Sequence, residues 1–178
     1  MERPVDTILE TGRLYLRKMQ ASDIVALCSI FQNETVMYAW EHTFTYGEVE
    51  AWIAECIFRY DRDGFSYWAV VTKTGSDLIG VAGIFTEEAE GEKHIGVGYI
   101  FDNAHWHKGY AYEAASACVR YGFEVLKLDE ITAQIRPTNI SSIRIAEKLG
   151  MTVTRSFIRK YRGKDVPHLL YTRTNMQP

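Results

Sequence analysis

Near its middle the chain reads Ile95-Gly96-Val97-Gly98-Tyr99-Ile100-Phe101, then Asp102-Asn103-Ala104-His105, then Trp106-His107-Lys108-Gly109-Tyr110-Ala111-Tyr112-Glu113-Ala114. The first part is apolar and rich in β-branched and aromatic residues, which predicts a strand. The last part opens a segment reaching Lys127, in which small and apolar residues recur at helical spacing: Ala111, Ala114, Ala115, Cys118, Val119 and Phe123. We therefore predict a strand, a short loop and a helix with one face against a sheet.

The start of this helix is a candidate anion site. Its first backbone N–H groups have no intrahelical partner, and the helix dipole adds positive potential there. Gly109 and Ala111 leave room for a diphosphate beside the main chain, and Lys108 adds a positive charge. The spacing matches neither the P-loop nor the dinucleotide-binding fingerprint. From these residues alone, an ordinary helix that begins at a glycine remains an equal alternative.

Further strands and helices are predicted on both sides of this stretch. The other predicted strands are 7–17, with a kink at Gly12, and 67–71, 78–85, 131–136, 152–161 and 168–174. The other predicted helices are 24–32 with Ser22-Asp23 as its cap, 48–60, and 140–149 between the caps Asn139 and Gly150. We interpret the polar run 86–93 as a surface turn. The resulting order is β-α-α-β-β-β-α-β-α-β-β.

Composition places limits on the class of protein. A chain of 178 residues, 47% hydrophobic and 24% charged, predicts a single globular domain spanning 1–178. The net charge of −3 argues against nucleic acid or an anionic membrane as a partner. Cys28, Cys56 and Cys118 lack metal-ligand spacing and predict free thiols. With neither a signal-like N-terminus nor a membrane-length apolar segment, we expect a soluble, cytoplasmic protein.

Three motifs together resemble the GNAT superfamily of N-acetyltransferases, and in particular its RimJ/RimL-type branch. They are the opening Arg13-Leu14-Tyr15-Leu16-Arg17, the loop 106–111, and Asn139-x-x-Ser142 followed by Lys148-Leu149-Gly150. The loop departs from the usual pattern, since Trp106 stands where Gln or Arg is common. The resemblance implies an α/β (α+β) fold with a mixed, mostly antiparallel sheet of about seven strands and about four helices. It also implies acetyl-CoA as donor and an amine as acceptor.

The resemblance also implies where acetyl-CoA lies. The strand before the loop pairs with the pantetheine arm in this family, and the loop amides bind the pyrophosphate. Carried over to this chain, the cofactor-binding residues are Tyr99, Ile100, Phe101, Trp106, His107, Lys108, Gly109, Tyr110, Ala111, Tyr112, Asn139 and Ser142.

The identity of the general base is open in this sequence. Many relatives carry a Glu on the strand before the loop, but the matching position here is Gly96. His94 and Glu87 are the candidates that we carry forward, and Glu88, Glu41 or His42 acting through a water are alternatives. Each of these is also explained as an ordinary surface residue. For protonation of the departing thiolate the resemblance suggests Ser142, whose other interpretation is a first-turn serine that satisfies the helix backbone.

The segment between the first two helices is expected to bind the acceptor through Tyr38, Trp40, Glu41 and His42. An equally weighted interpretation is that Tyr38 and Trp40 pin a loop onto the core. Three functions remain distinct: acetylation of a protein or peptide N-terminal α-amine, acetylation of a small amine, and a non-catalytic acyl-CoA-binding regulatory module. No metal is called for, and the protein is expected to be a monomer or homodimer.

Overall fold

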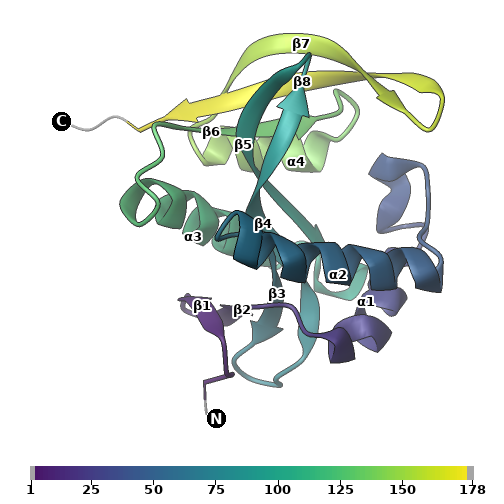
Figure 1. The fold of residues 1–178 in the computed structure, drawn as a ribbon, viewed down its shortest axis with the longest axis vertical. Helices are drawn as coiled ribbons and strands as arrows, with labels where there is room; N and C mark the ends of the chain where they lie inside the picture. The colour runs from purple at the N-terminus through teal and green to yellow at the C-terminus, as the bar shows by residue number, and fades with distance from the viewer. Residues whose placement is uncertain (1–2, 176–178) are drawn as a thin grey trace.

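The computed structural model describes residues 3–175, so the outermost residues of the expected domain, 1–2 and 176–178, lie outside the description. Eight strands form one sheet in the order β1-β2-β3-β4-β5-β6-β8-β7 (Figure 1). The strands are β1 (Thr7–Glu10), β2 (Leu14–Arg17), β3 (Tyr67–Thr72), β4 (Leu78–Ala89), β5 (Glu92–Phe101), β6 (Glu130–Ile135), β7 (Thr152–Tyr161) and β8 (Lys164–Thr174). Within the described residues every neighbouring pair is antiparallel except β5 and β6.

Four α-helices accompany the sheet: α1 (Ile24–Phe31), α2 (Tyr46–Arg62), α3 (Tyr110–Glu124) and α4 (Ile140–Lys148). Adjacent residues of a strand point to opposite faces, which locates two of these helices. Tyr67 contacts Trp52 of α2, with ring centroids 5.3 Å apart, whereas its neighbour Trp68 contacts Tyr121 of α3 at 5.5 Å. The central strands are thus covered on both faces, which explains why residues 79–84 of β4 are all buried.

The predicted fold class and the four helices are confirmed, but two strand predictions were wrong. The segment 7–17 is not one kinked strand, because the chain reverses between Thr11 and Leu14, and β1 pairs with β2. The run 86–93 is not a surface turn. β4 continues to Ala89, and β5 begins at Glu92 after a tight turn in which Glu90 and Gly91 have φ of 50° and 82°.

One helix cap also differs from the sequence prediction. The Asp23 carboxylate does not cap α1; it accepts from the backbone N–H of Gln20 at 2.8 Å and forms an ion pair with Arg17 at 2.6 Å. At the start of α4 the apolar Ile140 is 52% exposed, because it occupies the first turn of that helix. The caps Asn139 and Gly150 are confirmed, the latter with φ of 76°.

Two findings bear on the expectations from composition. The cysteines are free, with Cys56 and Cys118 buried and Cys28 half-buried. Within residues 3–175, no helix has both the length and the apolar character that crossing a membrane would require.

Candidate active site

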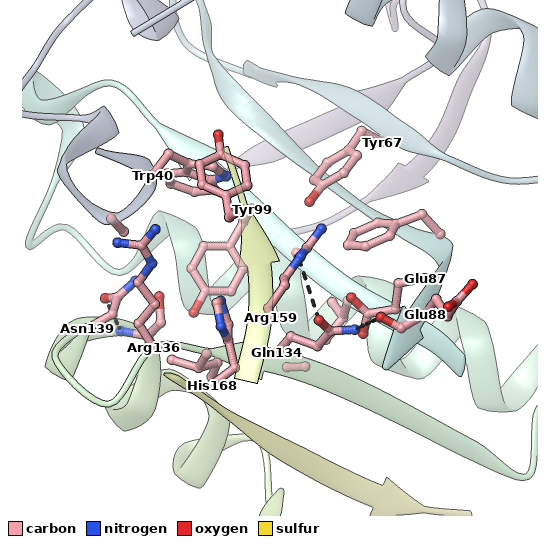
Figure 2. A pocket seen from close by; sticks show the side chains of 18 of the residues that line it. Trp40, Tyr67, Glu87, Glu88, Tyr99, Gln134, Arg136, Asn139, Arg159 and His168 are labelled. Atoms are coloured by element: carbon pink, nitrogen blue, oxygen red, sulfur yellow. Dashed lines mark hydrogen bonds between the residues drawn. The ribbon is translucent and has the colours of Figure 1, made fainter. Parts of the chain in front are cut away.

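The site begins where the two parallel strands of the sheet separate. β5 and β6 share one paired position, Gly96 with Thr132, and beyond it residues 97–101 have no described partner on β6. Backbone N–H and C=O groups on that side of β5 are therefore available to an extended ligand that carries amides. A cavity of about 420 Å³ opens at this point, lined by residues of β4, β5, β6, β7 and β8 and the start of α4 (Figure 2).

Two glycines of β5 shape the cavity wall because they leave space for side chains from neighbouring strands. A Cβ atom on Gly96 would lie 2.5 Å from Cδ of Glu87, so the Glu87 carboxyl group occupies the space that any larger residue would need. A Cβ atom on Gly98 would collide with the Tyr67 hydroxyl and lie 2.9 Å from Cε1 of Phe85. Gly96 thus makes room for a carboxylate donated by the adjacent strand.

Glu87 has the electrostatic character of a general base. Burial raises its pKa to about 7, opposed in part by a hydrogen bond from the Thr132 hydroxyl and by the positive charge of Arg159. The Thr132 Oγ1 atom donates to Oε1 of Glu87 at 3.0 Å, which fixes the orientation of the carboxyl group. A carboxyl group with this pKa exchanges its proton near neutral pH, as proton transfer in catalysis requires.

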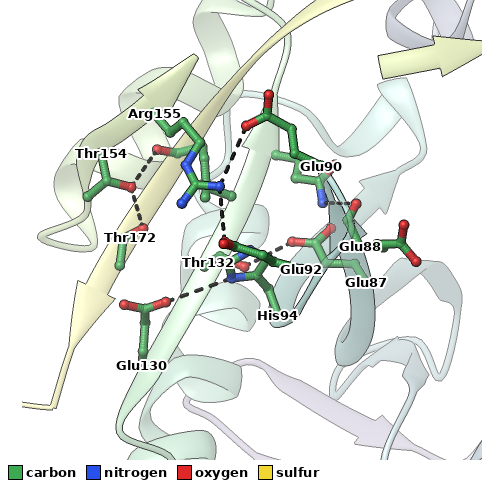
Figure 3. Close-up of polar contacts among 12 residues, drawn as sticks. Glu87, Glu88, Glu90, Glu92, His94, Glu130, Thr132, Thr154, Arg155 and Thr172 are labelled. Atoms are coloured by element: carbon green, nitrogen blue, oxygen red, sulfur yellow. Dashed lines mark hydrogen bonds and ion pairs between the residues drawn. The ribbon is translucent and has the colours of Figure 1, made fainter. Parts of the chain in front are cut away.

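His94, the other candidate base, lies outside the cavity lining. It stands opposite Glu87 in the β4–β5 register, but its ring lies between Glu92 and Glu130, with Nε2 and Nδ1 at 3.8 and 3.9 Å from their carboxylates (Figure 3). Glu88 does line the cavity and is exposed. Of the two bases carried forward from the sequence, the geometry keeps Glu87.

A polar cluster at the start of α4 lies beside Tyr99 on the same cavity. The Asn139 Oδ1 atom accepts from the Ser142 backbone N–H at 3.2 Å and from the Tyr38 hydroxyl at 2.9 Å. The Ser142 side chain forms a hydrogen bond with Tyr99, whose pKa burial raises to about 12. Tyr99 is therefore a neutral phenol, and the hydroxyl of this pair that accepts from the other keeps its own proton to donate into the cavity.

The next two residues of β5 contribute only backbone to this edge. Ile100 and Phe101 are buried, at 8% and 5% exposure, and belong to the hydrophobic core. Only their main-chain atoms are therefore open to a ligand along this edge, and the Phe101 carbonyl already accepts a hydrogen bond from the Trp106 indole N–H at 2.9 Å.

Trp106 and Lys108 stabilise the conformation of the loop that joins β5 to α3. The Trp106 indole ties the loop to the end of β5, and the Lys108 ammonium donates to the Ala104 carbonyl at 3.0 Å. His107 and Gly109 have φ of 60° and 81°, and this left-handed backbone at Gly109 leads directly into α3. Within residues 3–175 no backbone partner is recorded for the amides of Tyr110, Ala111 and Tyr112 in the first turn, so they are available to an anion, as the sequence predicts.

Arg13 of the N-terminal hairpin braces this loop from outside. Its guanidinium donates to the Lys108 carbonyl at 2.9 Å, lies 2.6 Å from the Glu113 carboxylate, and stacks 4.3 Å from the centre of the Tyr110 ring. Thr11 adds a hydrogen bond to Glu113 at 2.6 Å. The opening motif of the chain therefore has a local physical role at the start of α3. On the far side of the same turn, the Lys148 ammonium lies 4.1 Å from the centre of the Tyr112 ring.

The four residues expected to bind the acceptor are split between two hollows. Trp40 lines the main cavity, whereas Tyr38, Glu41 and His42 line a separate depression of about 350 Å³. Glu41 is held by Arg136 at 3.2 Å, and His42 Nε2 lies 3.0 Å from Glu48. Those two side chains are engaged in structural contacts.

Sequence reasoning missed several residues that line the main cavity: Tyr67, Gln134, Arg136, Arg159 and His168. The His168 Nδ1 atom lies 3.0 Å from the Val166 carbonyl, which can only accept, so Nδ1 carries the proton and Nε2 the lone pair. Burial lowers the pKa of His168 below its ordinary value, with help from Arg159 and Arg136, and keeps the ring neutral. The strands 152–161 and 168–174 were predicted, but no local motif places their side chains over the cavity.

The geometry fits acetyl-CoA. The free edge of β5 suits the amides of the pantetheine arm, and the first turn of α3 suits the pyrophosphate. Tyr99, Ser142 and Glu87 line the cavity into which the acetyl end of such a ligand would extend. A thioester bound in this cavity would share it with a hydroxyl donor from the Tyr99–Ser142 pair and with the Glu87 carboxyl group.

Comparison with known proteins identifies the family. A family model described as an acetyltransferase (GNAT) domain matches residues 13–152. YkkB of Bacillus subtilis (strain 168), an uncharacterized protein, is 33% identical over 156 residues, covering 87% of this chain and 90% of that one. A GNAT-family acetyltransferase from Bacillus anthracis superposes with a TM-score of 0.79 at 27% identity, over 93% of this chain and 97% of that chain.

A likeness in fold alone extends to RimL, a ribosomal L7/L12 α-N-protein acetyltransferase solved in complex with coenzyme A. It has a TM-score of 0.79 at 15% identity, over 94% of this chain and 97% of that chain. The family model alone spans well over half of the sequence, and the family resemblance seen in the motifs is confirmed. The chain belongs to the GNAT family of acetyltransferases.

Proposed function

We propose that this enzyme transfers the acetyl group of acetyl-CoA to the α-amine of a peptide or protein N-terminus, with Glu87 as the general base. The observation that carries the proposal is the Glu87 carboxyl group in the space left by Gly96, with a pKa of about 7. Acetyl-CoA supplies the acetyl group as a thioester, and a carbon–nitrogen bond replaces the carbon–sulfur bond. Glu87 takes the proton that the ammonium form of the acceptor must lose before attack.

The pKa of Glu87 favours an α-amine over an alkylamine. An α-ammonium group has a pKa of about 7.7 to 8.0, so passing its proton to Glu87 costs roughly one pK unit, or about 1.4 kcal/mol. A lysine-like ammonium has a pKa of about 10.4, which makes the same transfer cost more than about 4 kcal/mol. Because general bases work best when the two pKa values lie close together, this site suits N-terminal amines.

Ser142 and Tyr99 are proposed to assist the departing thiol group. Replacing Ser142 by alanine is expected to lower kcat by about tenfold, less than a full acid–base effect, because a thiol with a pKa of about 8.5 leaves without complete protonation. Steady-state assays of thiol release measure kcat. A Tyr99→Phe variant with the same loss would indicate that the two hydroxyls act as a pair. An unchanged kcat in Ser142→Ala would mean that Ser142 does not assist the thiol group and acts only as a first-turn residue of α4.

Arg13 is proposed to support coenzyme A binding through the loop that it braces. Replacing it by methionine is expected to raise the Kd for coenzyme A about fivefold, because a hydrogen bond and an exposed ion pair together contribute about 1 kcal/mol. Titration calorimetry measures the Kd. Arg62→Met is the matched control, because Arg62 also pairs with a carboxylate and lies over an aromatic ring, Phe58, but on α2. An unchanged Kd in Arg13→Met would mean that the loop keeps its shape without the brace.

The proposed function is tested by thiol release from acetyl-CoA with a panel of N-terminal peptides, polyamines and aminoglycosides. Turnover confined to peptides supports the proposal. Faster turnover of polyamines or aminoglycosides would replace it with small-amine acetylation. Calorimetric binding of acetyl-CoA without turnover of any acceptor would favour a regulatory acyl-CoA-binding module.

A further inference from the structure

The cavity wall carries three arginines, and one of them differs from the other two. Arg59 is paired with Glu55 at 2.7 Å, and Arg136 is paired with Glu41 at 3.2 Å. Arg159 also lines the cavity, but among residues 3–175 no carboxylate lies within ion-pair distance of it. Its recorded side-chain contact is weak, a donor–acceptor distance of 3.5 Å to Oε1 of Gln134 (Figure 2).

A second arginine on β7, Arg155, forms structural ion pairs and provides a comparison for Arg159. Arg155 and Arg159 are four residues apart on β7, so their side chains emerge on the same face. Arg155 meets the carboxylates of Glu90 and Glu92 at 3.5 and 3.0 Å and ties β7 to the β4–β5 turn (Figure 3). Between the two arginines, Phe157 belongs to a small buried cluster with Ala89 and Leu170. The strand is therefore anchored without Arg159, whose guanidinium extends into the cavity instead.

The surroundings of Arg159 leave its charge available to a ligand. Gln134 is neutral, and its amide nitrogen already donates to the Glu88 carbonyl at 3.0 Å. His168 is neutral with its proton on Nδ1. Glu87 is close enough for the Arg159 charge to lower its pKa, but its carboxyl group accepts a hydrogen bond from Thr132. A planar guanidinium with unused N–H groups matches a carboxylate, which it can bind through two parallel hydrogen bonds.

We propose that Arg159 determines acceptor specificity by binding a carboxylate that the acceptor carries close to its reactive amine. This inference rests on the proposed function and narrows its substrate class. An acceptor with an ammonium group and a nearby carboxylate matches the two charges of the cavity, the ammonium toward Glu87 and the carboxylate toward Arg159. The carboxylate belongs to an acidic side chain at the start of the peptide, beside the N-terminal residue.

A competing role for Arg159 has different consequences. If Arg159 only lowers the pKa of Glu87, its loss raises that pKa and slows every acceptor equally at neutral pH. The loss then disappears about two pH units above the Glu87 pKa, where the carboxyl group is ionised in any case. A lost carboxylate contact instead affects acidic acceptors alone and persists at high pH.

The test compares kcat/KM near pH 9 for two matched peptides, one beginning Ala-Asp and the other Ala-Asn. Native enzyme is expected to prefer the acidic peptide over its amide counterpart by about tenfold to a hundredfold, as a charge-assisted hydrogen-bond pair supplies. Arg159→Met is expected to abolish this preference mainly through KM, and Arg159→Lys to retain part of it. Arg155→Met, on the same strand face but outside the cavity, is expected to keep the full preference.

Each outcome of this test has a separate meaning. Equal turnover of acids and amides by native enzyme would overturn the carboxylate inference while leaving the proposed function intact. A preference that survives Arg159→Met at pH 9 would overturn the assignment to Arg159. If native enzyme turns over none of the peptides of the panel above but binds acetyl-CoA, the proposed function itself fails.

Discussion

Replacing Glu87 by glutamine is expected to lower kcat for peptide acetylation by about a hundredfold to ten-thousandfold, the range that loss of a general base produces. Glutamine keeps the size of the side chain and its ability to accept from the Thr132 hydroxyl, so the cavity should retain its shape. It cannot take a proton from the acceptor. The Kd for coenzyme A should stay unchanged, because the β5 edge and the start of α3 are untouched. Steady-state kinetics and calorimetry measure the two quantities.

The pH dependence of kcat/KM tests the role of Glu87 in a second way. Glu87 acts as a base only when ionised, so kcat/KM of the native enzyme should fall as the pH drops through about 7, the pKa of that carboxyl group. In Glu87→Gln the limb near pH 7 should be replaced by one at the pKa of the acceptor amine, about 7.7 to 8.0, because the low rate that remains follows the fraction of neutral acceptor. Glu50→Gln, an exposed carboxylate of α2, is the control expected to keep the native profile.

Kinetics of the same kind of variant also test one alternative general base, His168. His168 lies on the cavity wall as a neutral imidazole with its lone pair on Nε2. If Glu87→Gln keeps the native rate while His168→Gln loses it, the general base is His168 and the assignment to Glu87 is wrong. The acid limb would then lie below 6.5, because burial lowers the pKa of His168.

The fold was largely predictable because the elements that build it have strong local signals. The stripe from Ala114 to Phe123 is buried as its periodicity predicted, and Asn139 caps α4 as its residue type predicted. The errors fell where the local signal was ambiguous. Gly12 fits both a kink and a reversal, and only the pairing of β1 with β2 distinguishes them. The run 86–93 looks like a turn because its polar side chains stand at the ends of two strands, beyond the apolar core.

The site was less predictable because it depends on register between strands. The sequence offered Glu87 and His94 as candidate bases with equal support, and they prove to be cross-strand partners. Which of them faces the cavity depends on how β4 and β5 meet β6, a long-range feature absent from any local pattern. Arg159 and His168 were missed for the same reason, since the closing hairpin carries no motif that ties it to the cavity.

The complementarity of Gly96 and Glu87 leads to the sharpest expected result. Replacing Gly96 by alanine is expected to lower kcat about a hundredfold, the cost of displacing a catalytic group by about 1 Å, although alanine carries no reactive group. The new Cβ atom would occupy the place of the Glu87 carboxyl group and separate it from Thr132. The free energy of unfolding should change by less than about 1 kcal/mol, because the lost hydrogen bond is offset by the lower chain entropy of alanine when unfolded. Kinetics and urea unfolding together separate the two effects.

The matched control is Gly47→Ala, since a Cβ atom at Gly47 meets nothing within 4 Å, and its kcat should equal that of the native enzyme. The decisive variant is the exchange Gly96→Glu with Glu87→Gly, which returns a carboxylate to the cavity from the strand where many relatives carry it. We expect the exchange to recover at least about tenfold over Gly96→Ala, because a base is again within reach of the acceptor. Full activity in Gly96→Ala would mean that the position of the Glu87 carboxyl group does not matter to the reaction. Recovery in the exchange would mean that the site requires a carboxylate in this space and accepts it from either of two adjacent strands.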